Sequence, residues 1–90
     1  MDEWSWLDEL TEALGEEPLD RAHIGAMLKL SREVAHGVDR KMAPVSTFVA
    51  GLHVGRRVAA GASPREALRE VEDAASRLIP SVGEGGLGTP

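Results

Sequence analysis

Several residue types that support catalysis or covalent cross-linking are scarce or missing in this chain of 90 residues. It contains no cysteine and no tyrosine, and its aromatic side chains are two tryptophans and one phenylalanine. Without cysteine the chain cannot form disulfide bonds, a thiolate zinc site or a cysteine nucleophile. Its longest apolar runs fall far short of the ~18 residues that cross a bilayer, and its acidic start lacks the basic residues of a signal peptide. We therefore predict a cytoplasmic protein with no membrane-spanning segment.

Charge is unevenly distributed along the chain, whose formal net charge is −5. Residues 1–20 carry eight acidic side chains and no lysine or arginine, whereas residues 21–60 carry seven basic and two acidic side chains. Such a polarised surface can steer a charged partner, or the two regions can neutralise each other inside the domain. The acidic total, and the lack of a helix dense in lysine, arginine, asparagine and glutamine, argue against nucleic-acid binding.

Helical periodicity dominates the sequence. Apolar residues recur at intervals of three and four along four segments, as in amphipathic helices. The first segment starts behind Asp2 and ends at Gly15, and the second starts behind Asp20, because aspartate caps helices and glycine ends them. Gly37 is expected just past the end of the second helix, in the left-handed conformation. No segment alternates apolar and polar residues as strands do.

The third helix is predicted from about Pro44 to Ala60, because proline is tolerated in the first turn of a helix. The fourth is predicted behind Ser63, where the serine can cap the helix and Glu66 can complete a capping box. Pro80 ends this last segment.

The four helices predict the fold class. Short connections imply antiparallel neighbours, so we expect an all-α fold, a compact four-helix domain over residues 1–79. The glycine-rich residues 80–90 predict a flexible, disordered C-terminal tail. A domain of this size lies close to the limit at which one core outweighs chain entropy.

Small residues form a row on the third predicted helix. Gly51, Gly55 and Ala59 recur every four residues, so another backbone can approach this side of the helix closely, while Phe48 supplies bulk. In a soluble chain this spacing favours tight helix packing inside the domain. The alternative is a homodimer through Gly51 and Gly55, by analogy with glycine rows that pair membrane helices.

A catalytic constellation is difficult to assemble from this sequence. Ser46 and Thr47 are candidate nucleophiles and His36 and His53 candidate bases, but a triad needs a base, a nucleophile and an orienting group in contact. His53 has no acidic partner near it in the sequence. The three histidines also lack the HxxxH-type spacing of a metal site. We therefore predict a non-catalytic protein without a metal or cofactor.

Anion binding is the chemistry that the residue types favour most. Ser46 and Thr47 are expected at a helix start, where free N–H groups and the helix dipole attract negative charge. Arg40 and His36 precede them and could contact a phosphate or a phosphorylated cofactor. The structural alternative is that the hydroxyls cap the helix and that Arg40 pairs with a nearby acidic residue.

These central residues also carry a resemblance to a known family. The chain resembles a small actinobacterial helical domain of unknown function that occurs alone or fused to molybdenum cofactor guanylyltransferases. The similarity covers about residues 4–78 and rests on the motifs WLDEL-x-x-x-LG, AHGVDR, AP-VSTFV-x-G and GASPREAL.

The resemblance implies a docking or regulatory module in the synthesis of molybdopterin guanine dinucleotide, with the guanylyltransferase as partner. Lys41 stands where that family tends to have proline, and Ser46 where threonine is common. Because the chain lacks the glycine-rich nucleotide loop of the transferase, the implied role is accessory. The family's recurring residues fall here on His36, Gly37, Arg40, Pro44, Thr47, Phe48 and Gly51.

Overall fold

The structure, a computed structural model, describes residues 2–80 and contains only helices and their connections within that range. This confirms the predicted all-α four-helix fold. Of the predicted tail, residues 80–90, all but Pro80 lie outside the described residues. The helices are α1 (Glu3–Ala13), α2 (Arg21–Gly37), α3 (Met42–Ala59) and α4 (Pro64–Leu78).

Side-chain caps fix the starts of three helices where the sequence predicted them. Asp2 accepts a hydrogen bond from the backbone N–H of Ser5 at 2.8 Å, and Asp20 accepts one from His23 at 2.9 Å. Each carboxylate satisfies a first-turn N–H that has no partner within the helix. Gly15 follows α1 with a φ of 75°, as expected of a glycine that ends a helix.

Ser63 caps α4, but the predicted capping box is only half formed. The Ser63 hydroxyl oxygen accepts from the N–H of Glu66 at 3.1 Å. The Glu66 carboxylate does not complete the box; it lies 3.7 Å from Nη2 of Arg57 on α3. An ion pair between helices has therefore replaced a local contact.

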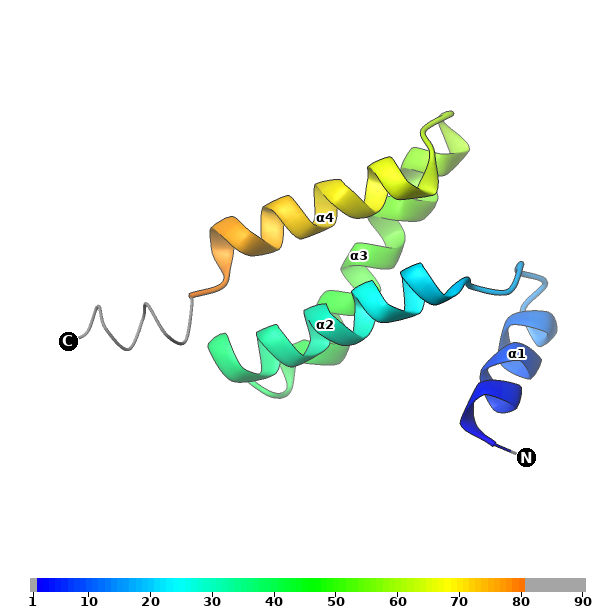
Figure 1. Cartoon of the computed structure of the whole chain (residues 1–90), viewed down its shortest axis with the longest axis horizontal. Coiled ribbons are helices and arrows are strands. Elements are labelled where there is room, and N and C mark those ends of the chain that lie inside the picture. Colours follow the sequence, from blue (N-terminus) through cyan, green and yellow to red (C-terminus); the bar gives the residue numbers. More distant parts are fainter. Residues whose placement is uncertain (1, 81–90) are drawn as a thin grey trace.

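The helices α2 and α4 both pack on α3, which passes behind them in Figure 1. They contact each other much less than either contacts α3. The helix α1 lies beyond the start of α2, apart from the other three. The fold is therefore a three-helix layer with α3 on one side and α1 projecting from one end.

The core of this layer is small. Its buried apolar side chains lie on α2, α3 and α4, and several are alanines, which allow close helix contact but bury little surface. Met27, Val71, Ala75 and Ile79 pack around Leu30, Val34 and Ala50. The buried apolar residues in the described range are Leu30, Val34, Ala43, Ala50, Ala67 and Leu68.

Gly37 has a different role from the one predicted. It is the last residue of α2, and positive φ angles among residues 2–80 occur at Gly15 and Gly61, not at Gly37. A Cβ atom at Gly37 would lie 2.7 Å from Cγ2 of Ile79 and 2.8 Å from the Pro80 carbonyl oxygen. The glycine therefore lets the end of α4 pack against the end of α2.

The start of α3 also differs from the prediction. The helix begins at Met42, and Lys41 precedes it in helical conformation without a side-chain cap. The Asp39 carboxylate accepts the Lys41 N–H at 2.9 Å, which closes the turn and starts the helix earlier. Pro44 is still tolerated because it lies in the first turn, where the backbone N–H groups have no helical acceptor.

Candidate functional site

An apolar groove of about 790 Å³ lies between α2, α3 and the start of α4. Met27 and Leu28 line it from α2, and Val54 and Val58 line it from α3. Within the described part of the chain, its titratable lining residues are Glu16, Glu17 and His23, with no lysine or arginine. The groove therefore suits an apolar segment rather than a phosphate.

Gly51 and Gly55 form an open part of the groove wall. A Cβ atom built on either glycine would have no heavy atom within 4 Å outside the backbone of its own helix. The packing predicted here inside the domain is therefore not found among residues 2–80. The reason is geometric: α2 and α4 pack on the side of α3 marked by Ala43 and Ala50, about a quarter turn away around the helix.

Phe48, the third predicted packing residue, also faces outward, with 66% of its surface exposed. Because residues three and four apart share a helix face, it continues an apolar row that we term the outer α3 stripe. This row lies next to the groove but on the far side of α3 from its neighbours. The outer α3 stripe consists of Val45, Phe48, Val49 and Leu52, each at least 48% exposed.

The hydroxyls of Ser46 and Thr47 do not form the predicted anion site. Both residues lie beyond the first turn of α3, so their own N–H groups can bond within the helix. The Ser46 hydroxyl donates to the Ala43 carbonyl at 2.7 Å, and the Thr47 hydroxyl donates to the Pro44 carbonyl at 2.8 Å. Both hydroxyls therefore donate to backbone carbonyls three residues earlier, whereas an anion site or a helix cap would need them beside free N–H groups.

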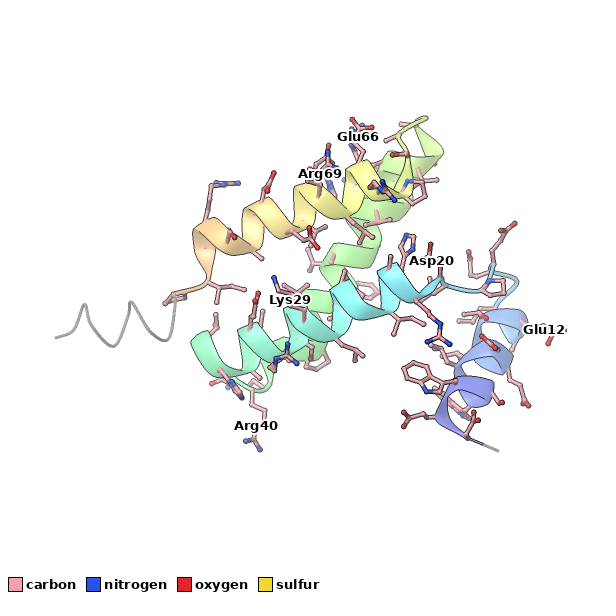
Figure 2. All side chains as sticks on the ribbon, in the orientation of Figure 1. Glu12, Asp20, Lys29, Arg40, Glu66 and Arg69 are labelled. Carbon is pink, nitrogen blue, oxygen red and sulfur yellow. The ribbon has the colours of Figure 1, made fainter. Side chains whose placement is uncertain are left out.

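The remaining two residues of the predicted anion site lie elsewhere. His36 lines a cavity beside α4, with Arg32 and Ile79, whereas Thr47 lines the apolar groove. Arg40 points away from the helices (Figure 2). The structure therefore does not bring His36, which lies on α2, and Thr47, which lies on α3, into one cavity.

A polar cluster joins α3 to α4 and was missed from the sequence. Nε2 of His53 lies 2.7 Å from Oε1 of Glu70, and Arg57 donates to both oxygens of that carboxylate at 3.0 Å. The hydrogen bonds from Arg57, and then from His53, lower the pKa of Glu70 to about 2. The same carboxylate raises the pKa of Arg57.

The spacing of these residues contained a signal. His53 and Arg57 are four residues apart, as are Glu66 and Glu70, so each pair shares a helix face. Two such faces of opposite charge on consecutive antiparallel helices can pair. Because His53 and Glu70 are 17 positions apart, local spacing alone does not show which residues of the two faces meet.

Neither a metal site nor a membrane-spanning helix is found in the described part of the chain. Among residues 2–80 no three potential histidine or carboxylate ligands lie together, and no helix is both long and apolar enough to cross a bilayer.

Together, the fold and the groove define a small all-α domain with an exposed apolar site. The chain belongs to the family described as a domain of unknown function (DUF6457), whose family model matches residues 2–86. No curated protein and no solved structure shows significant similarity to it.

Proposed function

We propose that this chain is a non-catalytic accessory domain that binds a partner protein through the groove between α2 and α3. The observation that carries the proposal is the open glycine wall of the groove. Gly51 and Gly55 leave the α3 backbone accessible, with no other part of residues 2–80 against it. An apolar helix of a partner could approach α3 closely there, as amphipathic helices do in the grooves of other domains.

The partner we propose is a molybdenum cofactor guanylyltransferase, and the process is the synthesis of molybdopterin guanine dinucleotide in the cytoplasm. This choice rests on the resemblance of the central motifs to a domain that is fused to such enzymes. In this proposal the chain docks on the enzyme or regulates it, and the transferase supplies all of the chemistry.

The lining of the groove supports a protein ligand over a small anion. The one basic side chain that lines it among residues 2–80 is His23, whose Nδ1 lies 2.6 Å from the Asp20 carboxylate. Glu16 and Glu17 add negative charge at the same site. A phosphate would therefore meet repulsion here, whereas an apolar side chain would be removed from water.

Titration calorimetry of the full chain with the purified guanylyltransferase tests the proposal. We expect binding, and we expect Gly55→Leu to weaken it at least tenfold, because the leucine side chain would fill the groove. Gly55→Ala is the matched control, since a methyl group occupies little of the groove and alanine favours the helix.

Circular dichroism separates lost binding from lost folding in this experiment. Both variants should remain helical, because the space beside Gly55 is open. No binding of the unmodified chain at tens of micromolar would refute the choice of partner. Equal affinities for Gly55→Leu and the unmodified chain would refute the groove as the binding site.

A further inference from the structure

The helix α1 exposes an apolar face that no other part of residues 2–80 covers. Trp6, Leu10 and Leu14 lie on this face, because they are four residues apart, and they are 57%, 40% and 66% exposed. A different side of α1 meets the rest of the chain, where Trp4 and Leu7 face the start of α2. In Figure 1, α1 lies away from α3.

A second uncovered surface, the outer α3 stripe, lies on the far side of the helical layer. With Ala43 and Ala50 buried on one side and the stripe on the other, α3 is apolar around most of its circumference. Helices of this kind are normally buried on all sides. Among residues 2–80, α2 and α4 cover only one side of α3, and no other described segment covers the stripe.

The small core is a further reason to expect that another molecule covers the α1 face and the outer α3 stripe. Domains below about 80 residues rarely gain enough stability from one core and often depend on oligomerisation or another reinforcement. Here much of the potential core, including Phe48 and both tryptophans, is at least half exposed. Covering the two surfaces would bury these large side chains.

The charges around the two surfaces are complementary. Residues 2–14, the cap and body of α1, contain five acidic residues and no basic one. Lys41, just before α3, lies four residues before Val45, and Arg56 lies four residues after Leu52, so a basic side chain flanks each end of the stripe. Glu3 lies three residues before Trp6, so it shares the apolar face of α1, and it is exposed to another molecule.

We infer that two copies of the chain form a reciprocal dimer in which α1 of each copy packs on the outer α3 stripe of the other. A second copy fits better than a foreign partner because one chain carries both complementary surfaces. A two-fold axis then makes each contact twice and covers both surfaces of both copies. This dimer differs from one through Gly51 and Gly55, because α1 and not a second α3 makes the contact.

The oligomeric state of the full chain gives the first test. Sedimentation and light scattering should find twice the chain mass of 9.6 kDa at micromolar concentrations. The only tryptophans in the chain, Trp4 and Trp6, are both on α1, so their emission should shift to longer wavelength as dilution separates the copies. A chain that stays monomeric at about 100 µM, a concentration at which even a weak dimer forms, would overturn the inference. Tryptophan emission that does not change with concentration, as expected if α1 packs within its own chain, would overturn it too.

Matched substitutions test which surfaces meet. Leu10→Glu on α1 and Phe48→Glu on the stripe should each raise the dissociation constant by about 100-fold or more, because each buries a charge at an apolar contact. Leu78→Glu at the end of α4, where the side chain is 73% exposed, is the control and should leave the dimer intact. A dimer that survives both interface substitutions would refute the proposed contact.

Mixing the two interface variants distinguishes this dimer from other symmetric ones. In a mixed pair, the intact α1 of the Phe48→Glu copy meets the intact stripe of the Leu10→Glu copy, so mixing should restore part of the dimer. Pairing of α3 with α3, or of α1 with α1, would show no such recovery.

A disulfide cross-link provides a second, independent measurement. The chain has no natural cysteine, so Leu10→Cys and Phe48→Cys each introduce a single thiol. Oxidising the mixture should give the mixed disulfide in preference to either homodimeric one. Preferential Phe48→Cys homodimers would instead indicate α3 pairing and overturn the inference, without affecting the test of partner binding at Gly55.

Discussion

The two sides of α3 differ in how completely the other described helices cover them. On the side that faces α2 and α4, Ala43 and Ala50 are buried, and Arg57 forms two hydrogen bonds with Glu70. On the groove side, Gly55 has open space beside it, and Phe48 beyond it is mostly exposed. The comparison shows that one helix can both complete a fold and present a surface for association.

The largest expected effect contrasts a buried leucine with an exposed one on α2. Leu30→Ala should lower the free energy of unfolding by about 2–5 kcal/mol, because it removes apolar surface from the core and leaves a cavity. Leu28→Ala, at a position 57% exposed, should cost less than about 1 kcal/mol. Urea unfolding at low micromolar concentration measures both. Equal losses of unfolding free energy in the two variants would show that the groove side of α2 is as well packed as the core.

A smaller loss of stability is expected from a substitution at the contact between the ends of α2 and α4. Gly37→Ala should destabilise the domain by about 1–3 kcal/mol, because its methyl group would overlap Ile79 and the Pro80 carbonyl. Thermal unfolding followed by circular dichroism measures the change. An unchanged or higher melting temperature would mean that the end of α4 does not pack on Gly37.

A glycine-to-alanine substitution on the groove side of α3 should have the opposite effect on stability. Gly55→Ala should stabilise the domain by about 0.5–1 kcal/mol, because alanine is the better helix former and its methyl group meets no other atom. Thermal unfolding again provides the measurement. A loss of stability would place another part of the chain against the glycine wall.

The smallest effect concerns acid stability at the α3–α4 cluster. The pKa of Glu70 falls from its usual 4.5 to about 2 in the folded chain, so its contribution to stability is full above pH 4.5 and is lost as pH falls through about 2. Glu70→Gln should therefore lower the melting temperature at pH 7, and the difference should shrink as pH falls below 4.5. A difference that does not change with pH would exclude an electrostatic role for the ion pair.

Local signals predicted the helices well where a side chain acts on its own turn. Asp2, Asp20 and Ser63 cap the helices that they were expected to cap, since a cap depends on residues only three positions apart. Gly37 differs from these caps, because a glycine that was predicted to lie just past a helix end is instead a point of close contact with the end of α4.

The candidate site was less predictable because it depends on which faces of α3 are covered. The row containing Gly51 and Gly55 was visible in the sequence, but periodicity cannot show whether a small-residue face packs inside a domain or remains open. His36, Arg40 and Thr47 were close enough in sequence to suggest one site. The path of the chain at the α2–α3 turn separates His36 from Thr47.

The sequence by itself therefore determined the four helices and the caps of three of them, because these depend on short-range hydrogen bonds and on the period of apolar residues. Only the tertiary structure decided that Glu70 meets His53 and Arg57, and that Gly55 faces an open groove. The physical reason is that such contacts depend on the relative rotation of packed helices. That rotation is set by the fit of all their side chains at once and not by any one segment.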